Sequence, residues 1–260
     1  MHDSLYRGSA EYYPVGRLPY PPELADALPL EPSQRVLDVG CGPGALTLLI
    51  APRVSAVVGI DAEEAMLAEA VRQAARAGVG NVEWRHLPAE ELPAGLGRFD
   101  LVTFAQSFHW MDRPAVAALV REMLEPGGAV VIVGATQHRG DESDDPLPHP
   151  RPPHDEIAAL VRSYVSPARQ VGYVTPEDEV MHAAGFCESS RVEVDTVRVV
   201  TRTVDEMVAA TFSLSVASPH LFGDELPRFE RELRALLQAA SDDALFSERT
   251  RTTGLFVYRR

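Results

Sequence analysis

The chain has 260 residues with 24 basic against 38 acidic side chains, which gives a formal net charge of −14. All the basic residues are arginine, so chemistry that needs a lysine, such as Schiff-base formation or Walker-type phosphate binding, is excluded. Because nucleic acids are held by basic patches, this acidic balance argues against a nucleic-acid partner. No apolar run approaches the roughly 20 residues that span a bilayer, and no targeting segment is recognisable. We therefore expect a cytoplasmic protein without a membrane partner.

The first half of the chain alternates short apolar runs with amphipathic stretches, which is typical of a parallel sheet covered by helices. Five strands are predicted in this half, over residues 36–39, 56–60, 82–87, 99–105 and 129–133. Helices are predicted where apolar residues recur at helical spacing, over residues 45–51, 63–77 and 114–124.

The second half begins with residues 137–153, a proline-rich and acidic stretch that we interpret as a lid or linker. Helices are predicted beyond it over residues 155–165, 177–184, 204–214 and 225–239, and strands over residues 192–200 and 255–258. The chain is expected to form a single domain over residues 1–260, with lid segments at about residues 1–28, 137–175 and 203–240. The predicted fold is α/β and Rossmann-like. It has a seven-stranded mixed sheet with helices on both faces and a helical lid over the carboxyl ends of the strands.

A glycine-rich turn, residues 37–44 (LDVGCGPG), lies between the first predicted strand and the first helix. Glycines let the backbone approach a ligand closely, and the start of the following helix presents free amides. The stretch also satisfies G-x-G-x-x-A, so a dinucleotide-dependent oxidoreductase has to be weighed. However, Asp38 would repel a pyrophosphate and Pro43 removes an amide that a phosphate would want. Asp38 suits an ammonium group better, with capping of the glycine turn as the alternative.

A second acid, Asp61, closes the second predicted strand 21 residues after Gly40. A carboxylate at this place can accept hydrogen bonds from both hydroxyls of a ribose. Together the two acids indicate a ligand that combines adenosine with an amino group.

With these motifs in order, the sequence resembles the class I S-adenosylmethionine-dependent methyltransferases. Residues 37–44 are similar to their first motif and Asp61 to their ribose-binding acid. Further similarities are residues 89–93 (AEELP) to the adenine-side loop, 99–102 (FDLV) to the fourth-strand motif and 124–128 (LEPGG) to the turn before strand five. The resemblance covers roughly residues 5–260 and implies S-adenosylmethionine as cofactor. The residues that it implies for cofactor binding here are Asp38, Gly40, Gly42, Gly44, Asp61 and Ala62.

Two further segments resemble the trans-aconitate methyltransferase-like enzymes, which act on small molecules. These are residues 17–21 (RLPYP) and residues 105–112 (AQSFHWMD). In such relatives the amino-terminal segment folds over the cofactor. The resemblance therefore implies that Arg17 pairs with the methionine carboxylate and that Gln106 lines the cofactor pocket.

The adenine side departs from the family pattern at Pro88, where relatives often carry an acid that serves the adenine amine. The resemblance then leaves the adenine contact to the backbone near Ala89 or to Glu90.

His109 follows the fourth predicted strand, on the side where open parallel sheets place their sites, so we consider it as a catalytic base. A structural hydrogen bond is the alternative. Trp110 and its aromatic neighbours suit either a sulfonium cavity or core packing. Cys41 is expected to be a small packing residue, since no basic neighbour lowers its pKa. The histidines of the acidic stretch fit no chelate spacing, so no metal is expected.

The sequence thus predicts methyl transfer to a small-molecule acceptor, without indicating whether oxygen, nitrogen or carbon is methylated. Two alternatives stay open. One is a methyltransferase-like cofactor-binding protein or cyclase that transfers no methyl group, and the other is an NAD-dependent oxidoreductase. The sequence does not indicate an oligomeric state.

Overall fold

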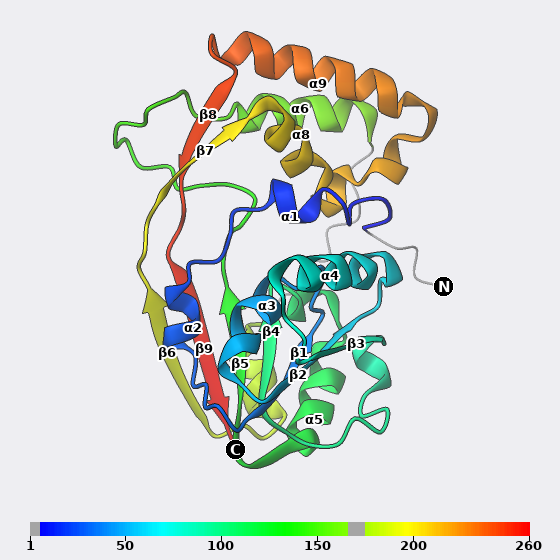
Figure 1. The fold of residues 1–260 in the computed structure, drawn as a ribbon, viewed down its shortest axis with the longest axis vertical. Helices are drawn as coiled ribbons and strands as arrows, with labels where there is room; N and C mark the ends of the chain where they lie inside the picture. The colour runs from blue at the N-terminus through cyan, green and yellow to red at the C-terminus, as the bar shows by residue number, and fades with distance from the viewer. Residues whose placement is uncertain (1–5, 166–174) are drawn as a thin grey trace. The chain divides into compact units, whose positions relative to one another are not determined.

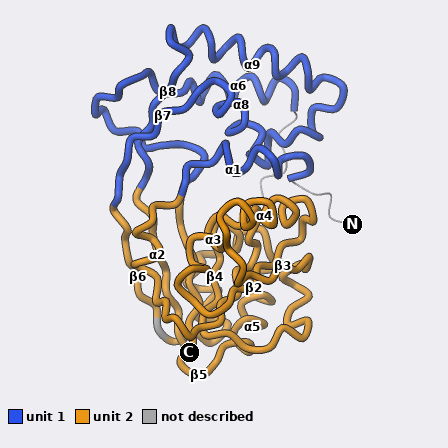
Figure 2. The backbone as a smooth tube through the Cα atoms, viewed as in Figure 1, with its two compact units in different colours: residues 1–19, 136–170, 196–251 blue, residues 20–135, 171–195, 252–260 orange. Residues whose placement is uncertain are grey.

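The structure is a computed structural model and describes residues 6–165 and 175–260. It divides into two compact units, which Figure 2 distinguishes by colour. Unit 1 comprises residues 1–19, 136–170 and 196–251, and unit 2 comprises residues 20–135, 171–195 and 252–260. Residues 1–5 and 166–174 of the predicted lid segments lie outside the described residues.

Unit 2 contains a seven-stranded mixed sheet, as the sequence predicts (Figure 1). In sheet order its strands are β3 (Val82–His86), β2 (Ala56–Asp61), β1 (Arg35–Val39), β4 (Phe99–Ala105), β5 (Leu124–Gly134), β9 (Thr253–Arg259) and β6 (Glu188–Val194). Strands β1 to β5 are parallel, whereas β9 runs antiparallel to both β5 and β6. The carboxyl ends of β1, β2 and β4 therefore lie side by side at one edge of the sheet.

Both faces of this sheet are covered by helices because side chains on successive strand residues point to opposite faces. On one face, Leu37 and Val39 of β1 share a core with α5 (Arg113–Met123) and α7 (Glu177–Ala183). On the other face, Val36 shares a core with α2 (Glu23–Ala27) and α3 (Ala45–Ile50). Asp38 has the same parity as Val36, so its side chain is on the α3 face. Helix α4 (Glu64–Ala77) packs against β2 and β3, and the 3₁₀ turns of unit 2 are η1 (Ala51–Arg53), η2 (Ala89–Glu91) and η3 (Phe108–Trp110).

Unit 1 combines helices with a two-stranded antiparallel sheet of β7 (Val199–Thr203) and β8 (Leu245–Arg249). Its helices are α1 (Tyr13–Gly16), α6 (His154–Tyr164), α8 (Val204–Phe212) and α9 (Leu226–Ala240), with 3₁₀ turns η4 (Ser215–Ala217) and η5 (Pro219–Glu225). The unit has its own apolar core, in which the Phe222 and Phe229 rings stack with centroids 4.1 Å apart. Helix α8 begins with a capping box between Thr203 and Glu206.

The prediction of one strand over residues 192–200 is wrong. Strand β6 ends at Val194 and pairs with β9, whereas β7 begins at Val199 and pairs with β8 in the other sheet. The alternation of apolar and polar residues shifts by one residue at Asp195 and Thr196, and this shift, which the prediction passed over, marks the division. Strand β8 and helices α1 and α2 were not predicted, and α2 contributes buried Leu24 to the core of unit 2.

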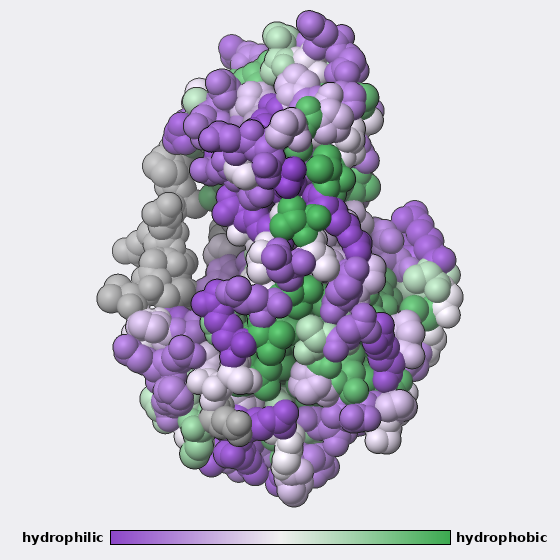
Figure 3. Space-filling model, turned by 90° about the vertical axis from the view of Figure 1, so that its left-hand side faces the viewer, coloured by the Kyte–Doolittle hydropathy of each residue, from purple (hydrophilic) through white to green (hydrophobic). Residues whose placement is uncertain are grey.

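Among the described residues, no helix is both long and apolar enough to cross a membrane. On the face drawn in Figure 3, hydrophilic residues are interspersed with smaller hydrophobic areas.

Candidate functional site

All the predicted site residues except Arg17 belong to unit 2. Asp38 lies on β1, Asp61 ends β2, and Gln106 and His109 follow β4. Because these three strands are neighbours in the sheet, their carboxyl ends bring the predicted residues to one edge. This is where open α/β sheets bind their ligands.

The glycine turn adopts a backbone conformation that side chains rarely accept. Gly40, Gly42 and Gly44 have φ angles of +68°, +53° and +87°. A Cβ at Gly40 would lie 2.5 Å from the Cβ of Ser107, and one at Gly44 would lie 2.8 Å from the Trp84 ring. A Cβ at Gly42 would meet nothing within 4 Å. The turn is therefore packed against the protein on two sides and open at Gly42.

Asp61 holds this turn in place. Its Oδ2 accepts a hydrogen bond of 2.8 Å from the amide of Gly42, and its Oδ1 accepts one of 2.9 Å from the amide of Glu63. Burial raises the pKa of Asp61, and these two amides oppose the rise. Each carboxylate oxygen retains capacity for a further donor, so the arrangement suits a ribose. The neighbouring Ala62 is exposed.

Asp38 is buried, with 1% of its surface exposed. Its Oδ2 accepts a hydrogen bond of 2.5 Å from the Thr47 hydroxyl, and its Oδ1 accepts one of 2.8 Å from the Thr103 hydroxyl. Burial raises the pKa of Asp38 to about 6, although the two hydroxyls oppose the rise. Asp38 thus joins β1 to α3 and β4, and its contact with a cofactor stays a prediction.

The segment after β4 turns back toward the glycine turn. Gln106 has a φ of +56°, and its side-chain amide donates to the carbonyl of Val133 at 3.0 Å. The Ser107 hydroxyl donates to the carbonyl of Val39 at 2.5 Å, which brings this segment against the end of β1.

His109 is half-buried in η3, and its ring centroid lies 4.8 Å from that of Trp110. Burial and the charge of Arg113 lower the pKa of His109, so the imidazole is neutral at pH 7. Phe104 and Phe108 are buried in the core, which assigns them to packing, whereas Trp110 is 39% exposed.

On the adenine side, Ala89 is buried in η2 and Glu90 is exposed. Glu90 Oε1 accepts a hydrogen bond of 2.9 Å from the amide of Asp112, the residue that caps α5. This contact ties the adenine-side loop to the segment that carries His109.

In unit 1, the Arg17 guanidinium donates to the carbonyl of Ser213 at 2.6 Å and lies over the Tyr13 ring at 4.6 Å. No structural contact bears on its predicted pairing with the methionine carboxylate, which rests on the resemblance.

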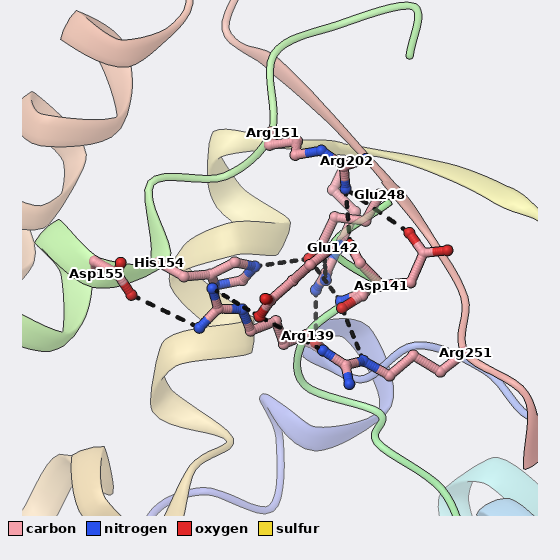
Figure 4. A network of polar contacts seen from close by, with 11 residues as sticks. Arg139, Asp141, Glu142, Arg151, His154, Asp155, Arg202, Glu248 and Arg251 are labelled. Carbon is pink, nitrogen blue, oxygen red and sulfur yellow. Dashed lines mark hydrogen bonds and ion pairs between the residues drawn. The ribbon is translucent and has the colours of Figure 1, made fainter. Parts of the chain in front are cut away.

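The predicted lid stretch of residues 137–153 is anchored within unit 1. Figure 4 shows His154 and Arg202 directed toward the buried carboxylate of Glu248. Glu248 also accepts a hydrogen bond of 2.9 Å from the amide of Gly140 in the stretch. His149 pairs instead with Asp243 at 2.7 Å. Within the described ranges, no group of three or more His, Cys, Asp or Glu side chains is arranged to hold a metal.

Sequence reasoning missed four residues that shape the site: Thr47, Trp84, Thr103 and Ser107. The two threonines did leave a signal. Each is a polar residue inside an otherwise apolar run. Thr47 lies in ALTLLI of α3, and Thr103 lies in LVTFA, the last five residues of β4. Trp84 left none, because β3 alternates polar and apolar residues as an ordinary edge strand does.

The methyltransferase domain family matches residues 36–128, which run from β1 into β5. This match identifies a methyltransferase domain over that part of the chain. It is 37% identical to an uncharacterised methyltransferase of Mycobacterium tuberculosis over 135 residues, which are 52% of this chain and 54% of that protein. It is also 38% identical to the ubiquinone biosynthesis O-methyltransferase of Acinetobacter baumannii over 99 residues, 37% of this chain and 42% of that protein. The matched region thus spans about half the length of these curated relatives or less.

The fold of the chain is similar to that of the YcgJ protein from Bacillus subtilis, with a TM-score of 0.53 and 20% identity. The similarity covers 91% of this chain and 96% of that one. The residues at this edge of the sheet are compatible with S-adenosylmethionine, the cofactor that the sequence resemblance implies. The turn is open at Gly42, and Asp61 is fixed beside it with capacity for further donors.

Proposed function

We propose that this methyltransferase transfers a methyl group from S-adenosylmethionine to an oxygen, nitrogen or carbon atom of a small molecule. The observation that carries the proposal is the hydrogen bond from the Gly42 amide to Asp61, at 2.8 Å. This bond sets a ribose-type carboxylate directly beside the open part of the glycine turn. A pyrophosphate would have to enter the same space against the charge of Asp61, which disfavours NAD.

Each cofactor-binding residue has a proposed task. Asp61 accepts the ribose hydroxyls with Ala62 beside it, and Gly40, Gly42 and Gly44 let the backbone approach the methionine part. Asp38 serves the ammonium group and Arg17 the carboxylate. The adenine falls to Ala89 or Glu90, and Gln106 lines the pocket. When bound, the cofactor supplies an electrophilic methyl group on a sulfonium, which the acceptor attacks in line.

The chain's own contribution to the reaction is to align the acceptor and to remove a proton where the acceptor carries one. We assign the removal of this proton to His109, because its imidazole is neutral at pH 7 and the residue follows the carboxyl end of β4. An acceptor that is already an anion needs no base, so for such an acceptor His109 only positions the substrate.

Two similarities support a small acceptor. The Acinetobacter relative carries ubiquinone biosynthesis in its name. Residues 17–21 and 105–112 resemble segments of the trans-aconitate methyltransferase-like enzymes. Neither similarity identifies the acceptor of this chain.

Calorimetry followed by a transfer assay tests the proposal. We expect S-adenosylmethionine and S-adenosylhomocysteine to bind and NAD not to bind. Cofactor with a labelled methyl group should then label an acceptor from a panel of small carboxylates, phenols and amines. Binding without transfer to any of them would favour the cofactor-binding or cyclase alternative. NAD binding without binding of S-adenosylmethionine would favour an oxidoreductase.

A further inference from the structure

We propose that Thr47 and Thr103 are positioning residues that hold the Asp38 carboxylate in the orientation that receives the cofactor's ammonium group. The inference rests on the proposed function, and it assigns a task to two residues whose hydroxyls donate to Asp38.

The geometry comes from three elements of unit 2. Asp38 on β1 is the direct register partner of Thr103 on β4, and both side chains are on the face that α3 covers. Thr47 lies in the first turn of α3, the helix that covers this face, and its hydroxyl donates to the carboxylate. The two hydroxyls donate to different oxygens, at 2.5 Å to Oδ2 and 2.8 Å to Oδ1. With both oxygens bound, the carboxylate cannot rotate without losing a hydrogen bond.

On the β2 side of Asp38, no side chain is present to donate a hydrogen bond at the paired position. Its register partner there is Gly59, and Gly59 is in turn the partner of Trp84 on β3. A Cβ at Gly59 would lie 2.8 Å from the Trp84 ring, so the indole covers the glycine closely. Asp38 is therefore set between a hydroxyl on β4 and an apolar ring beyond Gly59.

A buried carboxylate held by two neutral hydroxyls lacks a countercharge. Among the described residues, no arginine or histidine forms an ion pair with Asp38. Burying an unpaired charge is costly, and the donors to Asp38, which are the two hydroxyls and the backbone amide of Thr47, are all neutral and leave part of its acceptor capacity unused. A cationic ligand would provide the missing countercharge, and the ammonium group of the cofactor carries such a charge.

The ionised form of Asp38 is the form that receives a cation. Burial favours the neutral acid and both hydroxyls favour the carboxylate, so loss of either hydroxyl raises the pKa further. The other titratable groups near Asp38 are Asp61 on β2, whose charge also raises the pKa, and Cys41 in the turn. Asp61 serves the ribose, so its titration affects every adenosine ligand, with or without an amino group.

Titration of Asp38 should affect only ligands with an amino group, whereas titration of Asp61 should affect every adenosine ligand. Calorimetry between pH 5 and 8.5 can therefore test the inference directly. The ligands are S-adenosylhomocysteine, which carries the ammonium group, and 5′-methylthioadenosine, which lacks the amino-acid part. The variants are Thr47→Val and Thr103→Val, which keep the side-chain shape but lose the hydroxyl. The matched controls are Thr47→Ser and Thr103→Ser, which keep the hydroxyl.

For the valine variants, we expect the low-pH loss of S-adenosylhomocysteine affinity to begin about one pH unit higher than in the wild type. At pH 6 the affinity should fall roughly fivefold, which follows from such a shift. Binding of 5′-methylthioadenosine should not change, and the serine variants should restore the wild-type pH profile. An unchanged pH profile, or an equal loss for both ligands, would overturn the inference while leaving the proposed function standing.

If a valine variant does not fold, the serine variant and an alanine variant at the same position are compared, with the same expected shift for alanine alone. A wild-type protein that binds neither ligand at any pH would overturn the proposed function itself, and the inference with it.

Discussion

Gly42 and Asp61 lie 19 residues apart in the chain, yet the amide of the first donates to the carboxylate of the second at 2.8 Å. One side chain therefore ends strand β2 and fixes the conformation of the glycine turn. Under the proposed function, the same residue links the shape of the turn to the binding of a ribose.

Asp61→Ala should weaken binding of S-adenosylhomocysteine by about 1.5–3 kcal/mol, the range for hydrogen bonds to a charged group. Calorimetry gives the change directly. Glu64→Ala, which removes an exposed carboxylate from the first turn of α4, is the matched control and should bind as the wild type does. An unchanged affinity in Asp61→Ala would show that Asp61 does not contact the ligand.

His109→Gln should lower the turnover number by about 10²–10⁴-fold if the acceptor is a hydroxyl or an ammonium group, with little change in cofactor affinity. Because burial lowers the pKa of His109, the acid limb of the wild-type rate profile should lie below pH 6.5 and vanish in the variant. His182→Gln, at an exposed position on α7, is the control. Full activity of His109→Gln at every pH would reject a role as base.

The sequence was sufficient to predict the strands of the parallel half, because each buried strand is a short apolar run between turn residues. It also placed Asp38, Asp61 and His109 at the ends of neighbouring strands, since motif order fixes strand order in this fold. It could not show that Asp38 faces Thr103. That pairing depends on the register between β1 and β4, which are 60 residues apart, and no local pattern specifies it.

The antiparallel part was predicted less well for a related reason. The alternation of polar and apolar residues shifts by one residue at Asp195 and Thr196, where the chain passes from one sheet to another, and so small a shift was not interpreted as the end of a strand. An alternation of polar and apolar residues indicates which side chains share a face of the sheet, but it does not identify the neighbouring strand.

Gly59→Ala should destabilise unit 2 by about 1–3 kcal/mol, because the new methyl group would overlap the Trp84 ring and the backbone of β2 cannot yield easily. Denaturant unfolding measures the loss. Gly80→Ala is the control, since a Cβ there would meet nothing within 4 Å. A Gly59→Ala protein as stable as the control would show that Trp84 moves aside without cost.

Glu248→Gln should destabilise the protein by about 3–5 kcal/mol, because buried Arg202 would lose its charged partner. Burial alone would raise the pKa of Glu248, but the hydrogen bond from His154 and the charge of Arg202 lower it to about 2. The stabilisation by Glu248 is therefore present at neutral pH and is lost as the pH falls from about 4.5 to 2.

Thermal unfolding at a series of pH values tests this prediction. Glu142→Gln is the matched control, because that side chain is 70% exposed and its ion pairs contribute little. Equal melting temperatures for Glu248→Gln and Glu142→Gln would contradict it. Limited proteolysis would show in addition whether loss of the Glu248 contact with Gly140 makes residues 137–153 easier to cleave.

The two cysteines differ in accessibility, since Cys41 is buried within the glycine turn and Cys187 is exposed. Burial also raises the pKa of the Cys41 thiol. A brief pulse of an alkylating reagent should therefore modify the native protein once, at Cys187, and a second adduct should appear only in molecules whose glycine turn has opened. Mass spectrometry can count the singly and doubly modified molecules. The Cys41 thiol thereby serves as a reporter for the opening of the glycine turn.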